Sequence, residues 1–228
     1  MEKFVILIVG RGKLAEELLL GLTSPTISRV ARWDERNSTE GDRYIIIHAG
    51  SGRELDDVIE FCSVTGSILL DLSSGESQFP VTTKFPVVIC PNVNMQMLYF
   101  MAMVKNSSRF FQDQEIRISE SHQASKITKP GTALHLAKSL NIPEAEISSE
   151  RDPKVQNESL GIPSLFLDRH AYHEIVIKNK EVEIRLETKV LGKSAYASGL
   201  AKVIDIVVGQ KLSPGYYDIV DLVIDDIE

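Results

Sequence analysis

The first fifteen residues constrain the fold more than any other stretch of the chain. Phe4 to Val9 is an unbroken apolar run rich in β-branched residues, which predicts a parallel strand buried on both faces. It leads directly into Gly10-Arg11-Gly12-Lys13-Leu14-Ala15, and the pattern AEELLLGL that follows is typical of a helix. A strand, a glycine turn and a helix in this order indicate an α/β domain built on a parallel sheet.

The same turn has the residue types that hold a dinucleotide. Two glycines allow a tight turn and a close approach of a pyrophosphate, and the small Ala15 allows close packing of helix on strand. The phosphates would lie at the helix N-terminus, where N–H groups and the helix dipole favour negative charge. The motif also needs an acidic residue about 20 positions later, and Asp34 stands there, after an expected strand from Ile27 to Trp33. The alternative is a tight strand–helix turn without a ligand.

Asp34 bears on the choice between NADH and NADPH. Its carboxylate would hydrogen-bond the hydroxyls of the adenosine ribose, which favours NADH. Arg11 and Arg36 are close enough in sequence to offer a 2′-phosphate site instead, or they form part of a solvated face. We expect NADH or NADPH as the cofactor, with a lean to NADH.

Three further strands end in small, polar or flexible residues. They are expected at Tyr44–His48, Ile68–Leu72 and Val87–Cys90. The carboxyl ends of parallel strands line the ligand crevice of such a sheet, so a series of three favours a site over ordinary turns. The expected cofactor-binding residues are Gly10, Arg11, Gly12, Lys13, Leu14, Ala15, Asp34, Ala49, Gly50, Ser73, Ser74, Gly75, Pro91, Asn92 and Asn94.

The connections between these strands are less uniform. A helix is expected from Glu54 to Cys62, whereas the proline-bearing stretch from Gly75 to Pro86 is a poor helix candidate. Met95 to Val104 is apolar and predicts a buried helix at a domain junction, with its methionines in the core.

A second candidate site lies after the alternating segment from Glu115 to Glu120, which predicts a half-buried strand. The chain then becomes a polar loop that contains His122 and Lys126, before a helix for which Thr132 is a candidate N-cap. N–H groups around Gly131 and Thr132 could bind a carboxylate, and the two cationic side chains could hold an anion or carry a proton.

The rest of the chain predicts a supporting sheet. Asn141 to Ser164 is predicted to be a surface excursion, a charged loop of a kind that is usually mobile. Leu165 to Val190 predicts two antiparallel strands, turned at Lys178-Asn179-Lys180 and with one face exposed. His170 and His173 either serve the site or are satisfied strand-end histidines. A helix from Ala195 to Val208 should return to the first domain, with the acidic C-terminal segment packed on it.

Composition narrows the class of protein. The chain has 228 residues, 43% of them hydrophobic and 25% charged, which is ordinary for a soluble globular protein. A net charge of −7 argues against a nucleic-acid binder. Two cysteines form neither a disulfide framework nor a metal spacing, and no signal peptide or apolar run of roughly 18 residues is evident. We therefore expect a cytoplasmic protein without a metal or a membrane segment.

The stretch after the alternating strand resembles a known family. Glu120-Ser121-His122-Gln123-Ala124-Ser125-Lys126-Ile127-Thr128-Lys129-Pro130-Gly131-Thr132-Ala133 is similar to the Glu-x-His-His-x-x-Lys-x-Asp-x-Pro-Ser-Gly-Thr-Ala motif of dihydrodipicolinate reductase, now called 4-hydroxy-tetrahydrodipicolinate reductase. Further similar segments occur in the family's order over nearly the whole chain: Leu72-Ser73-Ser74-Gly75, Pro91-Asn92-Val93-Asn94, Tyr172-His173 and Lys193-Ser194-Ala195-Tyr196-Ala197-Ser198-Gly199.

The resemblance implies roles for individual residues. Lys126 would be the proton donor with His122 as its catalytic partner. Gly131 and Thr132 would bind a substrate carboxylate, and Gln123 would be a further substrate-binding residue. The reaction would be NAD(P)H-dependent reduction of 4-hydroxy-tetrahydrodipicolinate to tetrahydrodipicolinate in the diaminopimelate and lysine pathway. The family also implies a homotetramer assembled through the sheet of the second domain.

Departures from the motif keep two alternatives open. Gln123 replaces the second histidine, the serine before Gly131 is missing, and the glycine loop is one residue short. Gln123 and the tighter Pro-Gly-Thr turn favour another NAD(P)-dependent dehydrogenase or imine reductase of the same architecture. A non-catalytic nucleotide sensor is the other alternative. In each case we expect an α/β fold. Its Rossmann-type nucleotide domain comprises residues 1–94 and 194–228, and the inserted α+β substrate and oligomerisation domain comprises residues 95–193.

Overall fold

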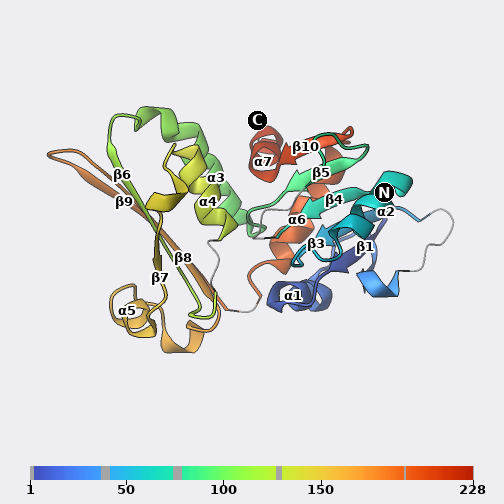
Figure 1. The fold of residues 1–228 in the computed structure, drawn as a ribbon, viewed down its shortest axis with the longest axis horizontal. Coiled ribbons are helices and arrows are strands. Elements are labelled where there is room, and N and C mark those ends of the chain that lie inside the picture. Colours follow the sequence, from blue (N-terminus) through green and yellow to red (C-terminus); the bar gives the residue numbers. More distant parts are fainter. Residues whose placement is uncertain (1–2, 37–41, 74–78, 127–129, 193, 228) are drawn as a thin grey trace. The chain divides into compact units, whose positions relative to one another are not determined.

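The computed structural model describes residues 3–36, 42–73, 79–126, 130–192 and 194–227 (Figure 1). The chain divides into two compact units. Unit 1 comprises Met1–Tyr99 and Tyr196–Glu228, and unit 2 comprises Phe100–Ala195. Unit 2 is therefore an insertion in unit 1, and each unit has its own sheet.

Unit 1 is a parallel α/β sheet with the strand order β10-β5-β4-β3-β1-β2. All of these neighbours pair in parallel, which confirms the Rossmann-type prediction. The strands are β1 Phe4–Val9, β2 Ile27–Arg32, β3 Tyr44–His48, β4 Ile68–Asp71, β5 Pro86–Ile89 and β10 Gly215–Asp218.

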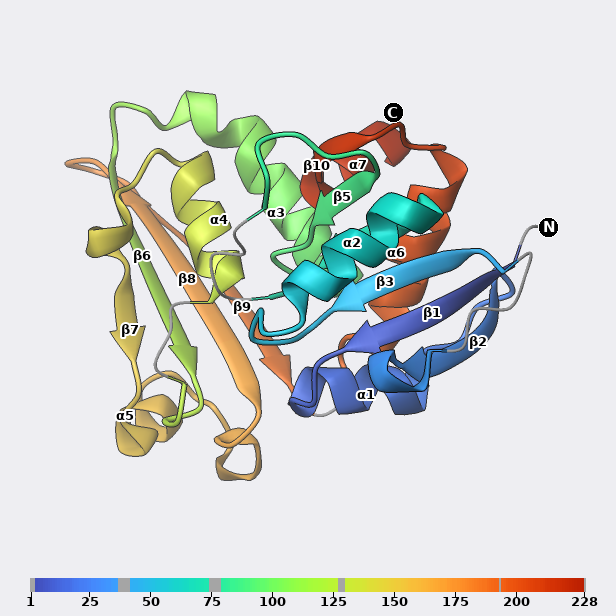
Figure 2. The ribbon, with the colours of Figure 1, turned by 45° about the vertical axis from the view of Figure 1, so that its right-hand side comes forward.

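Helices cover both faces of this sheet, as the apolar strands require. They are α1 Lys13–Gly21, α2 Leu55–Thr65, α6 Ala197–Gly209 and α7 Ile219–Ile227, with a short 3-10 helix, η1 Trp33–Glu35. Figure 2 shows α2 in front of the strands and α6 behind them. Every residue of β1 is buried, and Val5, Leu7 and Val9 pack with Val58 and Cys62 of α2 in one apolar cluster. Because helices cover the sheet on both sides, β1 has no face exposed to solvent and carries no polar residue.

Two predictions for unit 1 need correction. The second strand ends at Arg32, because Trp33 and Asp34 turn into η1 rather than continue as strand. The C-terminal segment does not simply pack on a helix, since Gly215–Asp218 forms β10 beside β5 before α7 begins. Because β10 has only four residues and its two tyrosines are adjacent, it shows no alternation by which it could be identified from sequence.

Unit 2 contains a smaller sheet with the order β7-β6-β8-β9. Its strands are β6 Glu115–His122, β7 Ser148–Glu150, β8 His170–Lys178 and β9 Glu183–Leu191, of which β6, β8 and β9 are antiparallel and β7 is parallel to β6. The helices are α3 Met95–Ser107, which starts in unit 1, α4 Gly131–Ser139 and α5 Pro153–Glu158, with 3-10 helices η2 Ser108–Phe110, η3 Glu144–Glu146 and η4 Ser164–Phe166.

The surface excursion expected between Asn141 and Ser164 is instead ordered secondary structure. It contains β7, which pairs with β6, and α5, whose first turn is capped by the Asp152 side chain accepting from Lys154 N. The helix after the polar loop begins at Gly131 with Pro130 as N-cap, so Thr132 is inside the helix and is not its cap.

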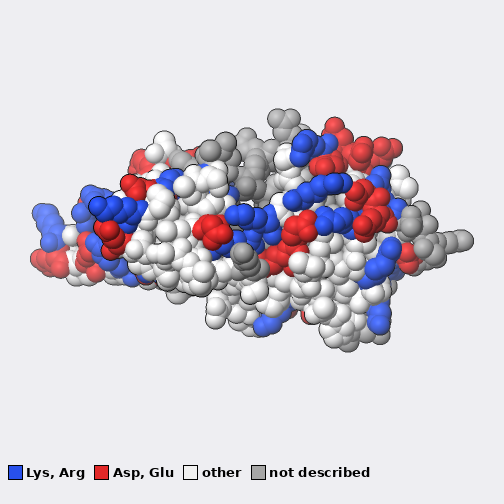
Figure 3. All heavy atoms as spheres, turned by 90° about the horizontal axis from the view of Figure 1, so that it is seen from below, with Lys and Arg blue, Asp and Glu red and all other residues white. Residues whose placement is uncertain are grey.

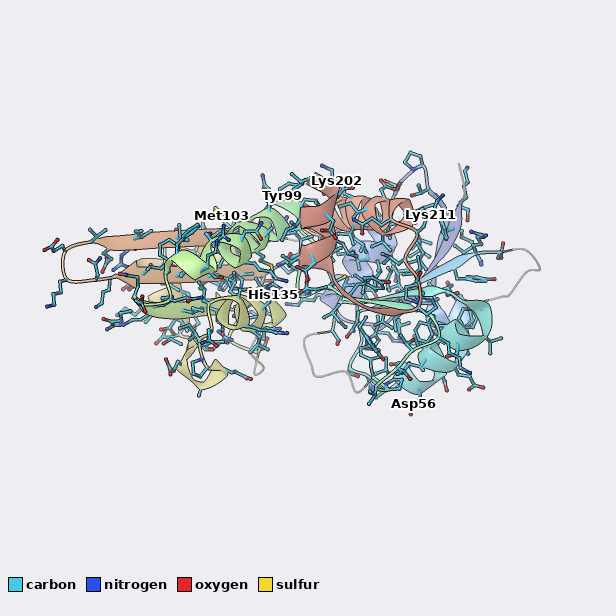
Figure 4. The ribbon with its side chains drawn as sticks, turned by 90° about the horizontal axis from the view of Figure 1, so that it is seen from above. Asp56, Tyr99, Met103, His135, Lys202 and Lys211 are labelled. Atoms are coloured by element: carbon cyan, nitrogen blue, oxygen red, sulfur yellow. The ribbon has the colours of Figure 1, made fainter. Side chains whose placement is uncertain are left out.

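Two burial predictions were also too simple. The helix α3 is not buried all round, because Tyr99 and Met103 are 46% and 50% exposed (Figure 4). One face of the hairpin was expected to be buried, but Val182 and Ile184, the apolar residues that alternate with charged ones there, are 55% and 39% exposed, so both faces reach solvent near the turn. On the face of the molecule in Figure 3, basic and acidic side chains are interspersed. Within the described ranges, no helix has the length and apolar character needed to cross a bilayer.

The packing of α6 in unit 1 gives a direct test. A Cβ at Gly199 would lie 2.0 Å from Val93 O, so we expect Gly199→Ala to lower the free energy of unfolding by about 1–3 kcal/mol. Gly209 of the same helix is the matched control, because a Cβ added there would meet no described atom within 4 Å. Gly209→Ala should leave stability equal or raise it by up to about 1 kcal/mol. Urea denaturation compares them, and equal effects would refute the close approach.

Candidate active site

The glycine turn in unit 1 fits an anionic ligand. Gly10 has φ +115, and a Cβ there would lie 2.6 Å from Ala49 O, so any side chain would be strained and would clash. Gly12 is the N-cap of α1, and a Cβ built on it would meet no described atom within 4 Å. The start of α1 is therefore open, with N–H groups that favour a diphosphate. Ala15 is fully buried where helix meets strand, while Lys13 is exposed and Leu14 half-buried.

Asp34 and Arg11 meet at the edge of this turn. Arg11 Nη2 donates to Asp34 Oδ2 over 2.7 Å, and the two side chains are 77% and 57% exposed. An exposed ion pair contributes only about 0–1 kcal/mol, so a ligand could compete with it. The Arg36 guanidinium instead stacks over Trp33 at 4.1 Å from the ring centroid and donates to Trp33 O. Of the candidate 2′-phosphate residues, Arg11 is the one next to Asp34.

The ends of β3, β4 and β5 reach the same edge of the sheet as Gly10, because these strands are parallel. Ala49 and Gly50 follow β3, Ser73 follows β4, and Pro91, Asn92 and Asn94 follow β5. The amide oxygens of Asn92 and Asn94 accept from Asn94 N and Met97 N, which shapes the start of α3. Ser74 and Gly75 lie outside the described residues.

One pair at this edge was not predicted from the sequence. His48 ends β3, Asp71 ends β4, and His48 Nδ1 lies 2.8 Å from Asp71 Oδ1. Both side chains are buried, at 0% and 5% exposed. A histidine and an aspartate closing two successive apolar strands is the sequence signal that could have indicated this pair.

In unit 2 the candidate residues converge on a buried carboxylate, Glu120. Glu120 and His122 are two positions apart on β6 and so share one face of the sheet. His122 Nδ1 lies 2.7 Å from Glu120 Oε2, and Arg151 donates to both carboxylate oxygens, over 2.6 and 3.2 Å. His122 is the last residue of β6 and its side chain is buried. The prediction that it lies in the polar loop was therefore wrong.

This arrangement changes the proton affinity of three groups. Burial by itself would raise the pKa of Glu120, but hydrogen bonds from His122, Arg151 and Ser149 outweigh it and lower that pKa to about 2. Burial lowers the pKa of His122, an effect that Glu120 opposes and that Lys126 and Arg151 reinforce. Burial also lowers the pKa of Lys126, again with Glu120 opposing and Arg151 reinforcing the shift. Glu120 thus remains ionised and favours the cationic forms of both neighbours.

Two more histidines lie beside His122. The ring centroids of His173 and His170 are 5.6 and 6.5 Å from that of His122. Burial lowers the pKa of His173 to about 3, with the charge of His122 acting in the same direction, so its ring is neutral near pH 7. His170 Nε2 is 3.0 Å from Ser121 Oγ, and its Nδ1 is 3.1 Å from Phe166 O. Both β8 histidines thus surround the site, and His170 is also a satisfied strand-end residue.

The loop after β6 is held by residues from the segment that contains β7 and α5. Arg151 Nε donates to Lys126 O over 2.9 Å, and Gln156 Nε2 donates to His122 O over 2.8 Å. Lys126 N donates to Gln123 O, which closes a turn with both side chains half-buried. Arg151 and Gln156 were not predicted, because nothing in the sequence connects them to the loop.

The start of α4 supplies the remaining candidate groups. Pro130 is in extended conformation before Gly131, and Thr132 is buried in the first turn. N–H groups at such a start can hold a carboxylate. Unit 2 thus combines a candidate proton donor, a buried carboxylate and a helix start that is a candidate anion site. Among the described residues, no group of three histidine, cysteine, aspartate or glutamate side chains is placed to hold a metal ion.

Comparison with known structures gives the same two-unit architecture. A dipicolinate-bound dihydrodipicolinate reductase from Paenisporosarcina sp. TG-14 superposes with a TM-score of 0.63 at 15% identity, over 95% of this chain and 97% of that one. An aspartate dehydrogenase from Thermotoga maritima gives a TM-score of 0.52 at 11% identity, over 94% and 100% of the two chains. At these identities the likeness shows the fold.

Sequence comparison points to one family. A 4-hydroxy-tetrahydrodipicolinate reductase from Arabidopsis thaliana is 28% identical over 61% of this chain, and the match spans only 44% of the plant protein. The enzyme of that name from Chlamydia abortus is 24% identical over 85% of this chain and 84% of its own length. The family profile for the C-terminal part of dihydrodipicolinate reductase matches residues 97–223, which cover unit 2, α6, β10 and most of α7. The chain therefore belongs to the dihydrodipicolinate reductase family.

Proposed function

We propose that this protein reduces 4-hydroxy-tetrahydrodipicolinate to tetrahydrodipicolinate with a nicotinamide cofactor, in the diaminopimelate and lysine pathway. The observation that carries the proposal is the cluster of Glu120, His122 and Arg151 around the loop of Lys126. It is supported by family membership and by relatives that are named for this reaction. The reaction adds a hydride and a proton and releases the hydroxyl group as water, so the protein must deliver protons near a dianionic ring.

Unit 1 would hold the cofactor, which supplies the hydride when bound. Gly10 and Gly12 would face the diphosphate, since a side chain at Gly10 would clash and the start of α1 is open. Asp34 would accept from the hydroxyls of the adenosine ribose, which favours NADH. The Arg11–Asp34 pair also leaves Arg11 within reach of a 2′-phosphate. Ala49, Gly50, Ser73, Pro91, Asn92 and Asn94 remain proposed contacts, as do the undescribed Ser74 and Gly75.

Lys126 would act as the proton donor in unit 2. Burial and Arg151 lower the pKa of its ammonium group, which makes the proton easier to transfer, while Glu120 keeps the group cationic before reaction. His122, whose Nδ1 is held by Glu120, would keep its Nε2 free to hold or relay a proton. His122 and Lys126 are therefore the proposed catalytic residues.

The substrate's carboxylates need donors. One would lie at the start of α4, against the N–H groups of Gly131 and Thr132. Gln123 would offer an amide N–H to the substrate, a neutral donor where the family motif has a histidine. The Gln123 amide and the backbone N–H groups of Gly131 and Thr132 would then all stay uncharged across the working pH range.

The assembly and compartment are part of the proposal. The outer strand of the unit 2 sheet, β9, has no further strand beside it among the described residues, and it carries the exposed Ile184. An open strand edge of this kind needs cover, so we propose a homotetramer formed through this sheet. Cys62 and Cys90 are free and buried, which suits a reducing compartment such as the cytoplasm.

The reaction is tested with the product of dihydrodipicolinate synthase and NADH or NADPH. We expect oxidation of the cofactor by the wild-type protein, and a loss of about 10²–10⁴-fold in turnover for Lys126→Ala, because the proton donor is removed. NADH affinity, measured by calorimetry, should be unchanged. Lys138→Ala, at the exposed end of α4, is the control and should retain full turnover. A Lys126→Ala protein as active as the parent would show the assigned mechanism to be wrong.

The role of Glu120 is tested by the pH profile of kcat/KM. Its carboxylate raises the pKa of Lys126, so Glu120→Gln should lower that pKa and move the alkaline limb of the profile towards neutral pH. Glu150→Gln is the matched control one strand away, since the Glu150 carboxylate accepts from Asp152 N instead. The account is contradicted if both variants keep the parent's alkaline limb.

Cofactor preference is tested at Asp34. We expect tighter binding of NADH than of NADPH by calorimetry, and a loss of about tenfold in NADH affinity for Asp34→Ala, the usual effect of removing a hydrogen-bonded charge. Glu35→Ala is the control, because the neighbouring Glu35 carboxylate accepts from the backbone N–H of Arg32, the N-cap of η1. An unchanged NADH affinity in Asp34→Ala would remove this residue from the site.

A further inference from the structure

A buried nitrogen of His48, at the end of β3, lacks a hydrogen-bond partner in the described part of the chain. His48 is completely buried, and its Nε2 has no hydrogen-bond partner among the residues that the structure describes. Leaving such a group unpaired costs about 1–3 kcal/mol. Its other nitrogen, Nδ1, is firmly held 2.8 Å from Asp71 Oδ1. An unpaired buried polar atom next to a candidate ligand site needs an explanation beyond packing.

The register of the sheet places this nitrogen beside the glycine turn. His48 is directly paired with Val9, the residue before Gly10, and with Asp71 on the other side. A Cβ built on Gly50 would lie 3.4 Å from His48 Nε2 and 3.5 Å from Gly10 Cα. Gly50 thus lies next to both His48 Nε2 and the turn that would face the diphosphate. Gly50 and Gly52 can rotate more freely than other residues.

The strand order identifies which half of a dinucleotide would pass His48. The diphosphate would lie over the end of β1, and Asp34, after β2, would hold the adenosine ribose. Since β3 lies on the opposite side of β1 from β2, a ligand that extends from the diphosphate towards β3 presents its second ribose there. His48 is therefore on the nicotinamide side.

The partner of Nδ1 decides what Nε2 can bind. Asp71 Oδ1 accepts from Ser73 N as well as from the ring, so the carboxylate is a hydrogen-bond acceptor and Nδ1 carries the hydrogen. In the neutral ring, Nε2 is then an acceptor. Phosphate oxygens are also acceptors and cannot pair with it, whereas a ribose hydroxyl can donate.

We propose that His48, oriented by Asp71, binds the nicotinamide-side ribose of the cofactor by accepting a hydrogen bond from a ribose hydroxyl at Nε2. Contact requires a small displacement of Gly50. The inference rests on the proposed function for the presence of a dinucleotide, but not on the substrate that is reduced.

Two ligands isolate this contact without any turnover. ADP contains the adenosine and diphosphate, and ADP-ribose adds the second ribose. Calorimetry should show that His48→Phe/Asp71→Asn binds ADP like the parent and binds ADP-ribose about tenfold more weakly. The double variant removes the ring nitrogens without leaving a buried carboxylate unpaired, and the amide oxygen that Asp71→Asn introduces can still accept from Ser73 N. Equal affinities of parent and variant for ADP-ribose would overturn the proposal.

The unmodified protein gives a second readout, which does not depend on whether the variant folds. In ¹⁵N NMR spectra, the Nε2 resonance of His48 should move on saturation with ADP-ribose and much less with ADP. No movement with bound ADP-ribose would overturn the contact while leaving the cofactor site in place. Failure of ADP, ADP-ribose and NADH to bind at all would instead refute the proposed function, and this inference with it.

Discussion

The candidate site depends on one buried carboxylate, Glu120, and on the charges that balance it. An ionised group with no solvent exposure is tolerated only if its oxygens are paired, and Glu120 is paired with His122 and with both terminal nitrogens of Arg151. Removing one partner of such a buried pair typically costs about 3–5 kcal/mol. The ion pair therefore fixes Arg151, and through its Nε it fixes the backbone of Lys126.

Unit 1 also contains a buried carboxylate that is paired with a histidine. Parallel strands bring their carboxyl ends to one edge, and β3 and β4, which are otherwise largely apolar, end there in His48 and Asp71. At that edge His48 and Asp71 form a second buried histidine–carboxylate pair, which orients one ring nitrogen and leaves the other without a described partner. In both units a carboxylate holds Nδ1 of a histidine, so Nε2 is the nitrogen that the ring can offer to a ligand.

The sequence predicted the features that have long or sharply patterned signals. The apolar run Phe4–Val9, the glycine turn after it and the two hairpin strands all form, although both faces of the hairpin reach solvent near its turn. The features that were missed are short, or they depend on contacts between residues far apart in the sequence. The strand β7 has three residues and depends on pairing with β6, so periodicity could not reveal it. Arg151 follows β7, and its contact with Glu120 exists only once that tertiary pairing has formed.

The central claim is that one chain holds a dinucleotide at the Gly10 turn and a cyclic dicarboxylate near Lys126. A crystal structure with NADH and dipicolinate bound together tests it most directly. The account predicts NADH with its diphosphate at the start of α1, and one dipicolinate carboxylate at the N–H groups of Gly131 and Thr132. The dipicolinate ring should lie within hydrogen-bonding reach of Lys126. Dipicolinate bound elsewhere, or an empty glycine turn at saturating NADH, would contradict it.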